Sequence, residues 1–181
     1  IATGFGRTGS LFACEQAGVA PDIMCLSKAL TAGTVAMAAT VATREVFEGF
    51  YGDDEASALI HGPTFPGNPL GGAAAHASLD LFEQEPRMAQ AAAIEEQLAA
   101  ELQPLSDLPA VADVRVKGAM GAVELPHGAY KDWMRRRFVD HGVWIRPLGE
   151  IAYVTPPLVS SSEEISRLTR ALGQVVREAF G

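Results

Sequence analysis

Apolar residues recur every three or four positions over most of the chain after Asn68, which is the spacing of helices with one buried face. The first such pattern is interrupted at Pro86 and then resumes, so we expect a long helical segment over about 68–103. Its apolar positions are Leu70, Ala74, Ala77, Leu81, Ile94, Leu98 and Leu102.

Two further helices are expected near the end of the chain. Gly142 would end the first of them, whose apolar face consists of Tyr130, Trp133, Met134 and Phe138. Ser161 and Glu164 have the spacing of a capping box at the start of the second. The buried stripe of this last helix would be Ile165, Leu168, Leu172, Val175 and Ala179.

Short apolar or alternating runs predict the strands. Residues 23–26 are all apolar and predict a fully buried strand, and residues 35–43 predict a second one, followed by a turn or two of helix over 44–50. After a polar loop at 52–65 and the long helix, four more strands are expected at 113–116, 119–125, 143–146 and 151–155. Strands and helices mixed in this way predict an α/β protein, with a change of domain indicated by the prolines of 104–109.

Composition and charge narrow the classes of function. Hydrophobic residues make up 48% and charged residues 20%, as in ordinary globular proteins. The formal net charge of −8 argues against nucleic acid or an anionic membrane as a partner. No run of 18 apolar residues is present, so a membrane span is not expected. Cys14 and Cys25 fit no metal or redox spacing, which favours a cytoplasmic protein with reduced thiols.

The first residues, Ile1-Ala2-Thr3, run directly into a glycine-rich turn without an initiator methionine. We therefore expect the chain to be part of a longer protein. The turn itself, Gly4-x-Gly6-x-x-Gly9, matches the spacing of a dinucleotide-binding fingerprint. That fingerprint needs a full strand before the glycines and an acidic residue after the next strand, whereas Asp22 stands before it. A dinucleotide-binding oxidoreductase thus stays a remote alternative.

Lys28 comes just after the apolar run at 23–26, and strand ends in α/β sheets border ligand crevices. Partial burial would lower the pKa of the amine, and a neutral amine is what attack on an aldehyde requires. A lysine that simply reaches solvent from a strand end is the alternative that position alone allows.

Other candidate positions are also ambiguous when taken singly. The backbone and hydroxyl groups of 61–65 precede a helix and could bind a phosphate, or form a plain turn. Arg146 ends a predicted strand and could clamp a carboxylate or form a surface ion pair, and Arg7 has the same two options. The spacing of His76, His127 and His141 indicates no metal site.

Together, three segments resemble the signature of class III aminotransferases: Thr3-Gly4-Phe5-Gly6-Arg7-Thr8-Gly9, Pro21-Asp22-Ile23 and Ser27-Lys28-Ala29-Leu30-Thr31. The segment Gly62-Pro63-Thr64-Phe65-x-Gly67-Asn68-Pro69 matches as well. The resemblance implies a pyridoxal-phosphate-dependent transferase of fold type I. Residues 1–85 would complete its large cofactor domain, and residues 86–181 would form the C-terminal small domain.

The resemblance also implies the roles of individual residues. Lys28 would be the catalytic Schiff-base lysine that holds pyridoxal 5′-phosphate, and Pro63 and Thr64 would reach the cofactor phosphate of the neighbouring subunit in a homodimer. Gly62, Arg146, Arg7 and Tyr153 would contact substrate, with Arg146 on its carboxylate. An acidic residue upstream of Ile1 would pair with the pyridine nitrogen, so we expect the 181 residues alone to be inactive.

Within the family, the resemblance is to the branch that acts in biotin synthesis, which uses S-adenosylmethionine as amino donor and 8-amino-7-oxononanoate as acceptor. It rests on His61-Gly62-Pro63-Thr64-Phe65, on 111–116, on 142–147, and on Tyr153 with Thr155-Pro156-Pro157. A class III enzyme for another ω-amino acid is the near alternative. Two positions depart from the family pattern: Ala32 replaces a usual glycine, and Ser10 a common lysine.

Overall fold

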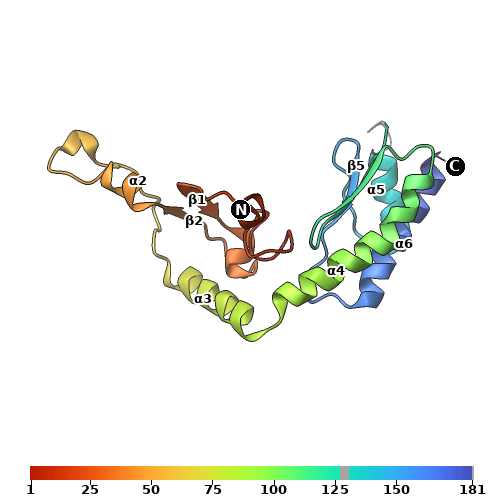
Figure 1. Cartoon of the computed structure of the whole chain (residues 1–181), viewed down its shortest axis with the longest axis horizontal. Helices are drawn as coiled ribbons and strands as arrows, with labels where there is room; N and C mark the ends of the chain where they lie inside the picture. The colour runs from red at the N-terminus through yellow and green to blue at the C-terminus, as the bar shows by residue number, and fades with distance from the viewer. Residues whose placement is uncertain (127–130, 181) are drawn as a thin grey trace. The chain divides into compact units, whose positions relative to one another are not determined.

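The computed structural model describes residues 1–126 and 131–180, so Tyr130 and His127 lie outside the described residues. The chain divides into two compact units (Figure 1). Unit 1 comprises Ile1–Phe5 and Ser10–Pro86, and unit 2 comprises Gly6–Gly9 and Arg87–Gly181. The prolines of 104–109 lie inside unit 2, so the change of domain that their pattern indicates is wrong.

Unit 1 combines a two-stranded antiparallel sheet with short helices and one long helix. The strand at 23–26, the helical turns after 43 and the helix after Asn68 are confirmed. Its elements are α1 (Ala13–Ala17), β1 (Ile23–Leu26), the 3-10 turn η1 (Lys28–Thr31), β2 (Ala39–Ala42), α2 (Arg44–Glu48), η2 (Glu55–Ser57) and α3 (Pro69–Gln84).

The strands of unit 1 are more exposed than their apolar sequence predicts. Ile23 is 54% exposed and Val41 is 53% exposed, although both were expected in fully buried strands. The reason is that β1 pairs only with β2 in this sheet, in the register Ile23↔Ala42 to Leu26↔Ala39. β2 is also shorter than the expected strand over 35–43.

Helix α3 buries a different face from the one that its apolar residues indicate. Leu70 and Leu81 are 71% and 43% exposed, whereas Gly71, Ala75 and Ser78 are buried. The small residues allow α3 to approach η1 and the loop behind it, because a Cβ added at Gly71 would lie 2.8 Å from the sulfur of Met37. The buried face of α3 is thus set by the close packing of backbones and not by the size of its side chains.

The described residues of unit 2 form a three-stranded antiparallel sheet in the order β3-β4-β5 and three α-helices. The predicted segments at 113–116, 119–125 and 151–155 are confirmed as strands, but 143–146 pairs with no strand among the described residues. Pro147 follows directly and lacks the amide hydrogen that a ladder needs. The elements are α4 (Arg87–Leu102), η3 (Gln103–Asp107), β3 (Asp113–Val116), β4 (Gly121–Glu124), α5 (Lys131–Asp140), β5 (Ile151–Val154) and α6 (Ser162–Phe180).

The core of unit 2 lies where α4 and α6 pack beside each other and α4 covers one face of the sheet (Figure 1). The predicted stripe of α4 is confirmed at Ile94, Leu98 and Leu102, and that of α6 at Ile165, Leu172 and Val175, whereas Leu168 and Ala179 are half-buried. The capping box between Ser161 and Glu164 forms in both directions. Burial of each large apolar side chain here contributes about 1.5–3 kcal/mol. The fully buried apolar side chains include Leu98, Leu102, Val123, Phe138, Leu172 and Val175.

Polar groups also join the helices of unit 2. The carboxylate of Glu101 on α4 accepts hydrogen bonds from Gln97, Ser166 and Thr169. Burial acts to raise the pKa of the Glu101 carboxyl, but these hydrogen bonds outweigh it and hold the pKa below its ordinary value. The carboxylate therefore stays ionised and joins α4 to α6 at neutral pH.

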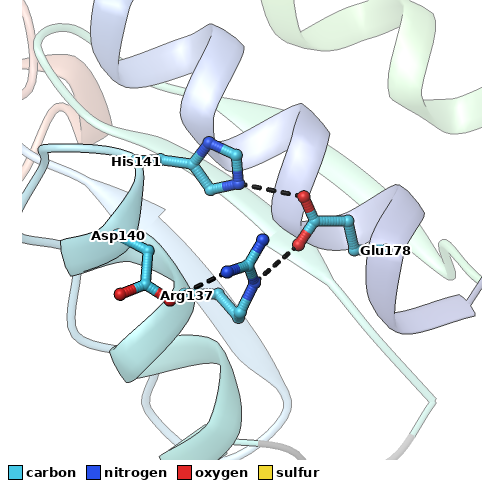
Figure 2. Close-up of polar contacts among 4 residues, drawn as sticks. All are labelled: Arg137, Asp140, His141 and Glu178. Atoms are coloured by element: carbon cyan, nitrogen blue, oxygen red, sulfur yellow. Dashed lines mark hydrogen bonds and ion pairs between the residues drawn. The ribbon is translucent and has the colours of Figure 1, made fainter.

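A cluster of charged side chains joins α5 to the end of α6 (Figure 2). Glu178 on α6 accepts a hydrogen bond from Nε of Arg137 at 2.8 Å and lies 3.0 Å from Nε2 of His141. A second nitrogen of Arg137 contacts Asp140 at 2.8 Å. The hydrogen bond from Arg137 lowers the pKa of the Glu178 carboxyl, so the pair is charged at neutral pH.

The glycine-rich turn of Gly6–Gly9 docks onto the β3–β4 turn of unit 2. The amide of Ala119 donates to the carbonyl of Arg7 at 3.0 Å. Gly118 has φ +54°, and a Cβ placed there would lie 2.4 Å from the backbone nitrogen of Gly9. Only glycine fits at this position, because both the conformation and the contact exclude a side chain.

We expect Gly118→Ala to destabilise the protein more than Gly149→Ala does. Gly149 has φ +58° but open space around it, so it carries the backbone strain without the clash. The difference in unfolding free energy should be about 1–3 kcal/mol, the usual range for overpacking, as measured by urea denaturation of the complete protein. Equal losses in the two variants would show that the loop does not pack against Gly118.

Candidate functional site

Lys28 opens the turn η1 directly after β1, with a left-handed backbone of φ 50°. Its side chain is exposed, which differs from the partial burial that the sequence led us to expect. Within 1–126 and 131–180, the amine forms no hydrogen bond or ion pair, so it is free to react.

The segment 61–65 of unit 1 is an exposed loop without regular structure. The approach to α3 is built by the residues after it: Gly67 has φ 64°, and the side chain of Asn68 accepts the amide of Leu70 at 3.0 Å. Asn68 thus uses part of the helix N-terminus that a phosphate could have occupied. Gly62 is open, since a Cβ there would meet nothing within 4 Å.

Unit 2 contains a pocket of about 470 Å³ that brings Arg146 and Tyr153 together. Residues 143–147 alternate between buried and exposed, which turns Arg146 outward with Val143 and Ile145 buried beneath it. The wall combines aromatic and aliphatic groups with one cation, a combination that suits an organic carboxylate. It is lined by Trp144, Ile145, Arg146, Tyr153, Val154, Thr155, Pro156, Pro157 and Leu168.

Arg7 supports the wall of this pocket from behind. One nitrogen of its guanidinium, Nη1, donates to the carbonyl of Pro156 at 2.6 Å and to the carbonyl of Ala119 at 3.0 Å. Burial lowers the pKa of Arg7, because removal from water disfavours the charged form. Arg7 therefore contacts backbone that lines the pocket, whether or not it also reaches a ligand.

The predicted site residues fall into two groups. Arg146 and Tyr153 share the pocket of unit 2, and Arg7 contacts its wall. Lys28, Gly62, Pro63 and Thr64 belong to unit 1. The sequence pattern did not identify Trp144 or Leu168 as pocket residues. The available signals were that Trp144 lies near Arg146 in the sequence and that Leu168 lies on the last helix.

The described residues form neither a metal cluster nor a membrane-spanning helix. Those residues contain no group of three or more His, Cys, Asp or Glu side chains that could hold a metal ion. None of the described helices is long and apolar enough to cross a membrane. The glycine turn packs on the β3–β4 turn instead of opening a helix, which differs from the geometry that a dinucleotide fingerprint requires.

Comparison with known families gives one match over nearly the whole chain. Residues 1–176 match the family described as aminotransferase class III. An adenosylmethionine-8-amino-7-oxononanoate aminotransferase of Corynebacterium glutamicum is 46% identical over 98% of this chain and 42% of its own length. The enzyme of that name from Geobacter sulfurreducens is 43% identical over 100% of this chain and 43% of its own length. The chain thus spans less than half of these relatives.

Solved structures agree with these sequence matches. The adenosylmethionine-8-amino-7-oxononanoate aminotransferase of Methanocaldococcus jannaschii superposes with a TM-score of 0.90 at 35% identity, over 98% of this chain and 44% of that one. The ω-transaminase of Pseudomonas jessenii in complex with PMP superposes with a TM-score of 0.89 at 31% identity, over 97% and 42% of the two chains.

We expect Arg7→Met to destabilise the complete protein by about 2–3 kcal/mol, because two carbonyls lose a charged donor. Urea denaturation measures the change. Arg44→Met is the matched control: Arg44 is exposed with only a 3.9 Å ion pair to Glu48, so its loss should stay within about 0.5 kcal/mol. A loss for Arg7→Met as small as that of the control would contradict its supporting role.

Proposed function

The chain belongs to the class III aminotransferases, and we propose that the complete protein transfers the amino group of S-adenosylmethionine to 8-amino-7-oxononanoate in biotin synthesis. The fold is α/β and of fold type I, the fold of the transaminases with which the chain superposes. The observation that carries the proposal is the 46% identity, over 98% of the chain, to a relative with that name. A cytoplasmic location is proposed with it.

The free amine of Lys28 fits a pyridoxal phosphate cofactor. A primary amine is the group that reacts with the aldehyde of this cofactor, and the Lys28 amine is exposed and without a partner among the described residues. The transaminase of Pseudomonas jessenii was solved with PMP, the aminated form of the same cofactor. We assign Lys28 as the residue that holds it.

Thr64 and Pro63 are proposed to contact the phosphate of the cofactor in a neighbouring subunit. Both lie on an exposed loop, together with apolar side chains that face solvent in this chain, among them Ile60 at 89% and Phe65 at 83% exposure. Exposed apolar groups of this size indicate a surface that another chain covers. The partner proposed is therefore a second copy of the protein, with small molecules as substrates.

When bound, pyridoxal phosphate acts as an electron sink for negative charge beside the reacting nitrogen. The role proposed for Lys28 is to move a proton: its Nζ takes the proton from the carbon of the amino donor and returns it at a second atom, as general base and then general acid. This requires a neutral amine for the first step and an ammonium for the second.

Arg146 is proposed to orient the acceptor through its carboxylate. The guanidinium can form two parallel hydrogen bonds to a carboxylate, which fixes direction as well as position. Trp144, Tyr153 and Leu168 would surround the hydrocarbon chain of the acceptor and exclude water. Gly62 would leave room for substrate, and Arg7 would act near it through the wall that Pro156 forms.

The division of the chain fits the same proposal. Unit 1, up to Pro86, would complete the large cofactor domain, and the part of unit 2 from Arg87 would form the small domain. The linking segment is two helices, α3 and α4, because Pro86 separates them. A second candidate function, amino transfer from an ω-amino acid as donor, is favoured by the superposition on ω-transaminases with a TM-score of 0.89.

The proposed function can be tested by asking which amino donor the complete protein accepts. S-adenosylmethionine alone, added to the complete protein loaded with pyridoxal phosphate, should convert the visible absorbance of the cofactor to that of its aminated form. Lys28→Ala should show no conversion, since no amine remains to move the proton. A protein that ignores this donor but responds to an ω-amino acid belongs to the second candidate function, and one that never acquires the visible absorbance lacks the proposed cofactor chemistry.

Arg146→Ala should raise the KM for the carboxylate acceptor about 10- to 100-fold, which corresponds to a lost charged hydrogen bond of about 1.5–3 kcal/mol. Steady-state kinetics at fixed donor concentration measure it. Arg146→Lys should recover part of the loss, because an ammonium keeps the charge but not the paired geometry. Arg136→Ala is the control, since Arg136 is exposed on α5 outside the pocket. An unchanged KM in Arg146→Ala removes this residue from its role.

A further inference from the structure

The turn that carries Lys28 has an unusual backbone at both ends. Lys28 has φ 50° and Ala32 has φ 51°, and Phe5 is the only other non-glycine residue with positive φ in the described part of the chain. A left-handed conformation costs about 1–2 kcal/mol for a residue with a side chain. Such a conformation persists only where neighbouring contacts hold it, and it is concentrated at functional sites.

Backbone bonds within the turn account for part of that support. The amide of Leu30 donates to the carbonyl of Ser27, and the amide of Ala32 donates to the carbonyl of Ala29, both at 3.0 Å. These bonds close the turn but do not connect it to the rest of unit 1. Beyond the bond from the amide of Thr34 to the carbonyl of Thr31, the connection is made by side chains.

Three hydroxyl groups tie the turn to its surroundings. Ser27 Oγ donates to the carbonyl of Met37 at 2.7 Å, and Thr31 Oγ1 donates to the carbonyl of Val35 at 2.7 Å. From the other side, Ser78 Oγ on α3 donates to the carbonyl of Ala29 at 3.0 Å. The turn is thus joined to the loop before β2 and to α3.

Two of these hydroxyl groups are deeply buried. Thr31 is 2% exposed and Ser78 is 5% exposed, and they are two of four buried polar side chains among the described residues. A buried hydroxyl group without a hydrogen-bond partner costs free energy. Both side chains therefore strongly favour the conformation in which these hydrogen bonds form. Removal of the Thr31 hydroxyl takes a donor from the carbonyl of Val35, and removal of the Ser78 hydroxyl leaves the carbonyl of Ala29 with the amide of Ala32 as donor.

We propose that Thr31 and Ser78, with Ser27, are positioning residues for the Lys28 amine: their hydroxyl groups hold the strained turn so that the amine meets its reaction partner in one orientation. This inference rests on the proposed function, in which Lys28 holds the aldehyde cofactor. It extends that function by assigning a task to residues that do not themselves touch cofactor or substrate.

The test measures how fast Lys28 captures the cofactor. Pyridoxal phosphate is added to the complete apoprotein, samples are reduced with borohydride over time, and the modified Lys28 peptide is quantified by mass spectrometry. Thr31→Val and Ser78→Ala should each slow capture about tenfold, because a misplacement of about 1 Å can cost on the order of 100-fold in rate. Thr31→Ser keeps the hydroxyl and should restore the rate to within about twofold of the parent.

Thr169→Val is the matched control. Thr169 is also a buried threonine, at 4% exposure, and its hydroxyl donates to Glu101 within unit 2, whereas the turn belongs to unit 1. It should lower the melting temperature but leave the capture rate unchanged. If Thr31→Val and Ser78→Ala lose stability as Thr169→Val does and still capture cofactor at the parental rate, the positioning role is overturned. Should one of the two variants fail to fold, the other decides.

Hydrogen exchange of the apoprotein separates this proposal from the proposed function. Amides of residues 28–34 should exchange faster in Thr31→Val and Ser78→Ala than in the parent, and Thr169→Val should leave them unchanged. If the parent captures no cofactor at Lys28, the proposed function fails and the positioning role falls with it. If the parent captures cofactor but exchange over 28–34 is the same in all proteins, the positioning role alone is overturned.

Discussion

Burial of apolar side chains from α4 and α6 is the interaction on which unit 2 depends. Leu98 and Leu172 are completely buried, and Val123 of the sheet packs in the same core. Because that core fixes α6 and β5, it also fixes the two sides of the pocket, which Leu168 and Tyr153 provide. The chemistry proposed for Arg146 therefore depends on a hydrophobic contact that does not include Arg146.

The outward direction of Arg146 depends on a second, local feature, the alternation of buried and exposed residues around it. Val143 and Ile145 are buried, and this alternation leaves Trp144 and Arg146 to face outward. Pro147 prevents the segment from continuing as a ladder strand, so the side chains at 144 and 146 lie beside an open pocket. A cation with aromatic neighbours can recognise the carboxylate of a molecule that is otherwise hydrocarbon.

In unit 1, polar contacts hold the candidate site residue Lys28 in place, as the hydrophobic core does for the pocket of unit 2. Its apolar cluster is small, with Phe5, Leu30 and Ala75 as the buried members, and its sheet has only two strands. The turn of Lys28 is held instead by hydroxyl groups that are directed at single carbonyls. Such bonds are directional, which suits a residue whose orientation matters more than its burial. Ala32, where the family resemblance led us to expect glycine, has φ 51°, a conformation that glycine adopts without strain.

Periodicity in the sequence was enough to predict the α/β class and most of the helices and strands of unit 2. It succeeded there because each amphipathic element finds its buried partner inside the unit, as Ile165 and Leu172 do. The motif around Lys28, and the arginine at 146, also led to the chemistry that we propose. Both signals are local, since they depend on residue types at fixed spacing.

Three features required the three-dimensional structure. The buried face of α3 follows close approach at Gly71 and not the leucines at 70 and 81, because packing distance and not hydrophobicity sets it. The hydroxyl of Ser78 meets the Lys28 turn from 49 residues away in sequence, and no local pattern reports such a contact. The docking of Arg7 on the carbonyl of Pro156 joins residues 149 positions apart, so it exists only once the chain has folded.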